Sequence, residues 1–141
     1  MSRFRRILVA VDGSEPSRTA LQVALDLAEA VGGEVEALGV EGPLPLFAAT
    51  SGEVEEAVRE RAAYVRGVLD EARSAGAARG VAITTTALAG HPAEVIVRHA
   101  EERRADLIVV GHKGHFLQDF PLGSTAARVT RHAPCPVLVV R

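Results

Sequence analysis

Hydrophobic positions along the chain follow two alternating patterns. Short runs rich in aliphatic or β-branched residues, such as residues 7–11, are typical of strands that are buried on both faces of a parallel sheet. Between these runs, apolar residues recur every three or four positions, as on one face of a helix. The pattern predicts five strands, at residues 7–11, 35–40, 81–88, 106–110 and 136–140.

Capping and breaking residues give the expected ends of the helices. Serine is a preferred N-cap, proline suits the first helical turn, and glycine commonly follows the last. We expect helices from Ser14 to Gly32, from Pro92 to about Arg104, and from Ser124 to just before Pro134. A further long helix is expected to begin at Glu53 and to be ended by Gly76 and Gly80. The apolar face of the second helix is expected to comprise Val58, Ala62, Val65, Leu69 and Ala72.

The order of these elements predicts an α/β fold. Strands that alternate with helices form an open parallel sheet with right-handed crossovers and helices on both faces. We expect a five-stranded Rossmann-like sheet in the order 3-2-1-4-5, formed by one domain over residues 1–141. Ligands of such sheets bind beyond the carboxyl ends of the strands at the switch point, here between the first and fourth strands.

A glycine-rich segment follows the fourth strand at this switch point. It reads Gly111-His-Lys-Gly114, then eight residues, then Gly123-Ser124-Thr125. Glycines let backbone N–H groups approach an anion, and a helix that opens with hydroxyl residues offers further donors to phosphate. Lys113 adds positive charge and is the only lysine among 16 basic residues. The alternative is a loop whose glycines only form turns and whose Ser124 only caps a helix.

Composition narrows the possible functions. Sixteen Lys and Arg residues against 18 Asp and Glu give a formal net charge of −2, which argues against non-specific binding to nucleic acid or an anionic membrane. The apolar stretch near the N-terminus is too short for a secretory signal, so we expect a cytoplasmic protein. We expect Cys135 to be a packed thiol, His99 and His132 to lie on the surface or at helix caps, and no metal site.

Several of these segments, in this order, resemble the universal stress protein (UspA-type) family over essentially the whole chain. They are the start at residues 6–14 (RILVAVDGS), the turn at 90–94 (GHPAE), residues 105–111 (ADLIVVG), the glycine-rich segment, and the end at 133–141 (APCPVLVVR). The resemblance implies an adenine-nucleotide α-hydrolase-like fold, either ATP-binding or nucleotide-free, that is usually dimeric.

The resemblance also implies a distribution of roles around an adenine nucleotide. The adenine side would be Ala10, Val11, Asp12 and Val40, and the ribose and phosphate side would be Gly111, Gly114, Gly123, Ser124 and Thr125. Asp12 would bind adenine or ribose or help to hold Mg²⁺, and its alternative role is to cap a turn. The ATP-binding branch has nine residues between the second and third glycines. This chain has eight, with Asp119 and Pro121 among them.

The expected function is an ATP-binding regulatory or sensor module in stress response, with Mg²⁺ as a possible companion ion. No residue resembles a poised general base or arginine finger, so we expect little or no hydrolysis and no catalytic residue. The alternative is a nucleotide-free homodimeric interaction module. In either case the apolar strand at 136–140 would lie at a sheet edge, where pairing with a second copy would cover it. A transferase or ligase of the wider class would need more chain length.

Overall fold

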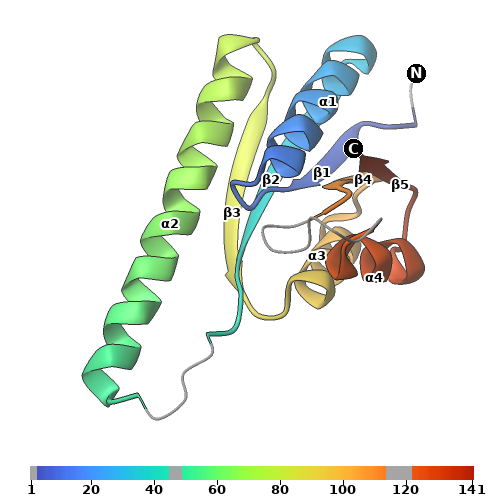
Figure 1. Ribbon diagram of the computed structural model, residues 1–141. Helices are drawn as coiled ribbons and strands as arrows, with labels where there is room; N and C mark the ends of the chain where they lie inside the picture. Colours follow the sequence, from blue (N-terminus) through green and yellow to red (C-terminus); the bar gives the residue numbers. More distant parts are fainter. Residues whose placement is uncertain (1–2, 45–48, 114–121) are drawn as a thin grey trace.

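A computed structural model of the protein describes residues 3–44, 49–113 and 122–141. It contains one five-stranded sheet in the order β3-β2-β1-β4-β5, in which every neighbouring pair is parallel (Figure 1). The expected fold class and strand order are therefore confirmed. The elements are β1 (Arg6–Ala10), α1 (Glu15–Val31), β2 (Glu34–Glu41), α2 (Ser51–Ala78), β3 (Ile83–Ala89), α3 (Pro92–Arg103), β4 (Leu107–Gly111), α4 (Ser124–His132) and β5 (Val137–Val140).

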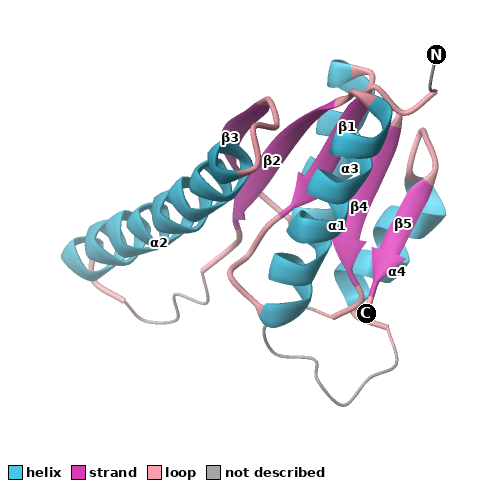
Figure 2. Ribbon diagram, turned by 90° about the horizontal axis from the view of Figure 1, so that it is seen from above, coloured by secondary structure: helices cyan, strands magenta, loops and turns pink. Residues whose placement is uncertain are grey.

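Helices cover both faces of the sheet (Figure 2). Consecutive residues of a strand point to opposite faces, so Ile7 and Val9 pack with α1 and α2, and Leu8 packs with α3 and α4. β1 and β4 are almost wholly buried, whereas the edge strands β3 and β5 are partly exposed. No helix in the described part of the chain is long and apolar enough to cross a membrane.

The caps of α1 form as the sequence predicts. The Ser14 hydroxyl accepts a hydrogen bond from the backbone N–H of Ser17 at 3.3 Å, which satisfies one of the free donors of the first turn. Gly32 ends the helix in the left-handed conformation, with φ of 70°, and its N–H bonds to the carbonyl of Ala28.

Arg79, just after α2, joins that helix to α1. Its guanidinium donates to Glu29 at 2.9 and 3.0 Å and to the side chain of Gln22 at 3.0 Å, and it also pairs with Asp26. The hydrogen bonds to Glu29 and Asp26 hold the pKa of Arg79 above its ordinary value. This cluster keeps the two helices together on one face of the sheet.

The expected end of the second helix is wrong at Gly76. This glycine lies inside α2 and is buried against β3. The position requires glycine because a Cβ there would come within 2.4 Å of Cγ2 of Ile83. Gly80, with φ of 66°, provides the turn that follows the helix. Val58 was expected in the buried face but is 48% exposed, because the first turns of α2 extend beyond the sheet (Figure 1).

Replacing Gly76 by Ala is expected to destabilise the protein by about 1–3 kcal/mol, because overpacking against Ile83 outweighs the better helix propensity of alanine. Gly67→Ala is the matched control in the same helix, since Gly67 is exposed and a Cβ there meets nothing within 4 Å. That variant is expected to gain about 0.5–1 kcal/mol. Urea unfolding measures both, and equal effects of the two substitutions would contradict the packing explanation.

Candidate functional site

A cavity of about 120 Å³ lies at the carboxyl ends of β1, β2 and β4, next to the start of α4. This is the switch point at which the sequence predicts a ligand. The structure brings seven of the predicted site residues to its walls, namely Ala10, Val11, Asp12, Val40, Gly111, Lys113 and Thr125. Residues more than 100 positions apart in the chain therefore share one wall.

The remaining predicted residues of the glycine-rich segment have different places. Gly123 is the N-cap of α4, and its N–H donates to the carbonyl of His112 at 2.7 Å, so this N–H closes the segment instead of facing a ligand. Ser124 is the first residue of the helix and is not its cap, so the expected capping role of Ser124 is wrong. Gly114, Asp119 and Pro121 lie outside the described residues.

The start of α4 still offers donors at the cavity. The N–H groups of the first helical turn, at Ser124, Thr125 and Ala126, have no acceptor within the helix. The positive end of the helix dipole lies at the same place. Thr125 adds a hydroxyl to the cavity wall, and Lys113 adds an ammonium group.

Asp12 forms a turn as well as lining the cavity. Its Oδ1 accepts hydrogen bonds from the Ser14 backbone N–H at 2.9 Å and from the Ser14 hydroxyl at 2.5 Å. Its own backbone N–H donates to Oγ of Ser17 at 3.1 Å. The alternative role of Asp12 as a turn residue is thus realised, and Oδ1 is engaged within the chain.

Two glycines at this site are required by close packing. Gly13 has φ of 83°, and a Cβ there would lie 2.3 Å from the hydroxyl oxygen of Tyr64, which itself donates to the Asp12 carbonyl at 2.8 Å. A Cβ at Gly111 would lie 2.8 Å from backbone and side-chain atoms of Pro16 at the start of α1. The packing of β4 against α1 thus explains Gly111 without reference to a ligand.

Sequence reasoning missed the other residues of the wall. They are Ser17, Leu38, Pro92, Ile96, Val110 and Ala126. Ser17 carries a readable signal, because it stands three positions after the cap residue Ser14 and next to the predicted switch point. The apolar residues carry none, because their spacing along the chain is that of ordinary core positions.

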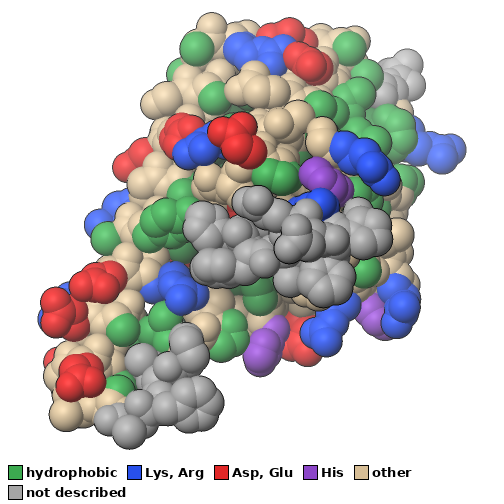
Figure 3. All heavy atoms as spheres, in the orientation of Figure 1, with side chains coloured by type: hydrophobic (Ala, Val, Ile, Leu, Met, Phe, Trp, Pro, Cys, Tyr) green, Lys and Arg blue, Asp and Glu red, His purple; other side chains and the backbone are tan. Residues whose placement is uncertain are grey.

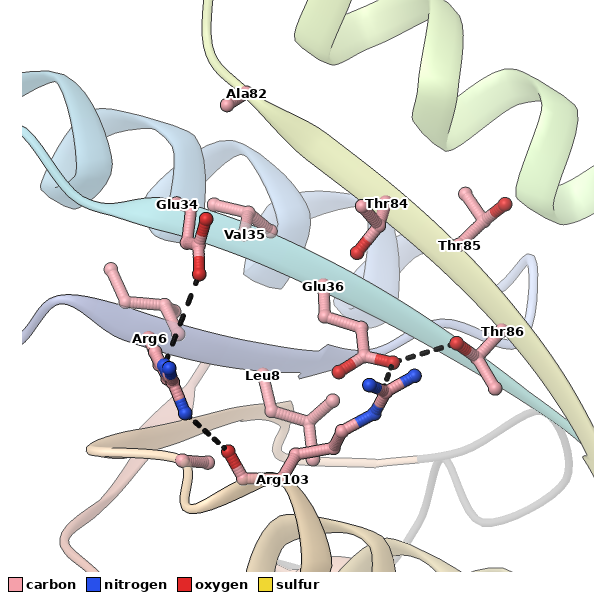
Figure 4. Close-up of a pocket in the computed structure, with 12 residues that line it drawn as sticks. Arg6, Leu8, Glu34, Val35, Glu36, Ala82, Thr84, Thr85, Thr86 and Arg103 are labelled. Atoms are coloured by element: carbon pink, nitrogen blue, oxygen red, sulfur yellow. Dashed lines mark hydrogen bonds and ion pairs between the residues drawn. The ribbon is translucent and has the colours of Figure 1, made fainter.

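A second cavity, of about 380 Å³, lies near the amino-terminal ends of β1, β2 and β3 (Figure 4). Glu36 on its wall accepts hydrogen bonds from Thr86 at 2.6 Å and from Nε2 of His99 at 2.7 Å, and Arg103 lies 3.7 Å away. The expectation that His99 lies on the surface or at a cap is therefore wrong. Its ring is buried, because α3 packs this face against β2.

These contacts keep Glu36 ionised. Burial works to raise the pKa of its carboxyl group, but the hydrogen bonds from Thr86 and His99 and the charges of His99 and Arg103 outweigh burial. The pKa of Glu36 thus lies below its ordinary value. Because this cluster is at the end of the sheet opposite the switch point, we assign it to stability and not to the predicted ligand site.

The described residues hold no group of three or more metal-ligating side chains. Cys135 is half-buried, and burial raises the pKa of its thiol, so the thiol form prevails near neutral pH. Acidic and basic side chains are mixed along α2 on the face shown in Figure 3, which is typical of a solvated helix surface.

Comparison with known proteins gives a family and a set of relatives. The Universal stress protein family matches residues 3–141 of this chain. Universal stress protein YxiE of Bacillus subtilis is 33% identical over 150 residues, covering 98% of this chain and 99% of that protein. A universal stress protein of Thermus aquaticus is 37% identical over 142 residues, covering 98% and 99%.

Solved structures agree with the fold. Universal stress protein UspA from Lactobacillus plantarum superposes with a TM-score of 0.91 at 28% identity, covering 100% of both chains. A universal stress protein solved in complex with cAMP has a TM-score of 0.77 at 27% identity, covering 99% of both. One from Archaeoglobus fulgidus in complex with dAMP has a TM-score of 0.69 at 26% identity, covering 99% and 100%.

Glu36→Gln is expected to lose about 1–2 kcal/mol of stability near pH 7, because it leaves His99 without its charged partner. A lowered pKa means that the ionised carboxylate stabilises the fold above its ordinary pKa of 4.5, and that this contribution disappears as the pH falls through the folded-state value. The difference between variant and wild type should therefore shrink in acid.

Glu34→Gln is the control, since Glu34 is 67% exposed on the same face of β2 and its pair with Arg6 spans 4.0 Å. We expect that substitution to cost less than about 0.5 kcal/mol. Urea unfolding at several pH values measures both variants. A penalty for Glu36→Gln that stays constant with pH would contradict the role of the ionised Glu36 carboxylate.

Proposed function

The chain belongs to the universal stress protein family, and we propose that the cavity at its switch point binds an adenine nucleotide, with ATP as the ligand of a regulatory or sensor module in stress response. The observation that carries the proposal is the convergence of the predicted adenine-side and phosphate-side residues on one cavity. The cAMP and dAMP complexes of two relatives support the adenine class of ligand.

The two sides of the cavity suit the two parts of a nucleotide. Val11, Leu38, Val40 and Ile96 provide apolar contacts for the flat face of adenine. At the other side, Lys113, the Thr125 hydroxyl and the first N–H groups of α4 provide charge and donors for ribose and phosphate. The described walls enclose about 120 Å³, less than the roughly 300–1,000 Å³ of typical small-molecule sites, so the phosphates would extend out of this cavity.

The chemistry of the wall favours binding over turnover. Asp12 is the one carboxylate among the described lining residues, and its Oδ1 is engaged by Ser14. The described lining residues include no histidine and no arginine. An efficient phosphoryl transferase needs a positioned base or water, a held metal ion and groups that stabilise the transition state. We propose that ATP, with or without Mg²⁺, is sensed and hydrolysed slowly or not at all.

We also propose that two copies pair through residues 136–140. The bonds of Ile108 N–H to Pro136 and of His112 N–H to Val140 show that the even-numbered residues of β5 face β4. In a parallel pair the N–H of Val139 must then point away from the sheet, toward a partner strand. Leu138 is 37% exposed beside this edge.

Added ATP is expected to raise the melting temperature in proportion to the logarithm of its concentration, and calorimetry should show saturable binding. Thr125→Val keeps the shape of the side chain and removes its hydroxyl, so we expect about three- to ten-fold weaker binding. Thr130→Val is the matched control in α4, since the Thr130 hydroxyl bonds to the Ala126 carbonyl within the helix.

The same experiment distinguishes the proposed function from the alternative, a nucleotide-free interaction module. Wild-type protein that gives no binding heat and no shift in melting temperature with ATP, AMP or cAMP would be a nucleotide-free interaction module. Mass spectrometry of small molecules released from the denatured, purified protein provides an independent answer.

Val139→Pro removes an outward N–H while leaving the bonds between β4 and β5 in place, so it is tolerable on an edge strand. We expect the wild type to be a dimer in light scattering and this variant to be a folded monomer. A wild-type monomer at high micromolar concentration, or a variant that still dimerises, would contradict pairing through this edge.

A further inference from the structure

A side chain from α2 reaches the turn that follows β1. The hydroxyl of Tyr64 donates to the carbonyl oxygen of Asp12 at 2.8 Å, across 52 residues of sequence. Tyr64 is half-exposed and does not line the cavity, whereas Asp12 does. This hydrogen bond therefore connects the long helix to the wall of the proposed nucleotide site from behind.

The bonded carbonyl belongs to the peptide unit between Asp12 and Gly13. Gly13 has φ of 83°, and a glycine at such a position allows the peptide unit before it to rotate at low cost. The described residues contain no cis peptide, so the N–H of Gly13 points opposite to the Asp12 carbonyl and away from Tyr64. Rotation of this unit would exchange an N–H donor for a carbonyl oxygen on the side that faces away from α2.

Bonds within the turn hold other parts of Asp12. Ser14 binds the carboxylate, and Ser17 accepts from the backbone N–H. Neither bond acts on the carbonyl, which is the group that the Tyr64 hydroxyl holds. The hydroxyl end of Tyr64 also lies where a Cβ of residue 13 would be, so glycine and tyrosine fit each other at this point.

We propose that Tyr64 is a positioning residue of the nucleotide site, because its hydroxyl fixes the orientation of the peptide between Asp12 and Gly13. This orientation sets the part of the cavity wall that Asp12 contributes. The inference rests on the proposed function, because it concerns the affinity of the same cavity. A rotated peptide would move the backbone of Asp12 at the cavity wall, on the side assigned to adenine, and so would weaken binding of the nucleotide there.

The composition of the chain makes this testable by a direct optical signal. Tyr64 is the only tyrosine, and the chain has no tryptophan. Its emission therefore reports on one hydroxyl group beside the site. We expect ATP to change the fluorescence of Tyr64 with a midpoint that equals the dissociation constant from calorimetry.

The test compares two variants that each remove one hydrogen bond between α2 and the rest of the fold. Tyr64→Phe should bind ATP about three- to ten-fold more weakly than wild type, the range expected for one lost hydrogen bond. Thr85→Val removes the acceptor of Arg73, bonded at 2.6 Å at β3, and should leave ATP affinity unchanged. In two-dimensional NMR spectra, the amide signals of Asp12 and Gly13 should shift or split in Tyr64→Phe and not in Thr85→Val.

The outcomes separate this inference from the proposed function. Equal ATP affinity in wild type and Tyr64→Phe overturns the role of Tyr64 and leaves the nucleotide site standing. Equal losses in both variants also overturn it, since they indicate a general loosening of α2. A wild type that binds no ATP overturns both proposals. Where Tyr64→Phe does not fold, the wild-type titration decides: ATP binding without any change in Tyr64 emission or in the two amide signals overturns the inference.

Discussion

The close approach of β4 to the first turn of α1 is the constraint on which the site depends. At the switch point of a parallel sheet, the chain leaves β1 and β4 in opposite directions, and the space between their carboxyl ends becomes a cavity. Here the end of β4 lies so near to Pro16 that a Cβ at Gly111 would be within 2.8 Å of it. This contact brings the glycine-rich segment and the β1–α1 turn to the same cavity.

The β1–α1 turn shows how local and distant contacts combine. Ser14 caps α1 and binds Asp12, which are interactions between neighbours in sequence. The hydroxyl of Tyr64 adds a contact from α2, and the conformation of Gly13 makes room for it. The turn thus has little freedom although Asp12 is exposed at its tip. Preorganisation of this kind lowers the cost of ordering a site when a ligand binds.

The two ends of the sheet differ in how their charged groups are engaged. At the amino-terminal end, Glu36 is enclosed by Thr86, His99 and Arg103, so its negative charge is compensated within the fold. At the carboxyl end, Lys113 and the start of α4 line the same cavity as the carboxylate of Asp12. The cavity at the amino-terminal end is the larger of these two, but the polar groups around Glu36 already satisfy one another. We therefore place the ligand site in the smaller cavity at the carboxyl end.

The sequence by itself determined the order of the elements, the position of the switch point, the caps of α1 and seven residues of the cavity wall. The order, the switch point and the caps follow from hydrophobic period, capping chemistry and the topology of parallel sheets, all of which act locally or through chain order. Among the wall residues, Ala10, Val11 and Val40 were expected only from the resemblance to the universal stress protein family. Only the tertiary structure decided that Gly76 lies inside α2, that His99 is buried, that the Gly123 N–H closes onto His112, and that Tyr64 reaches Asp12. Each depends on which residues meet across the fold, because packing between elements, and not periodicity within one, sets those contacts.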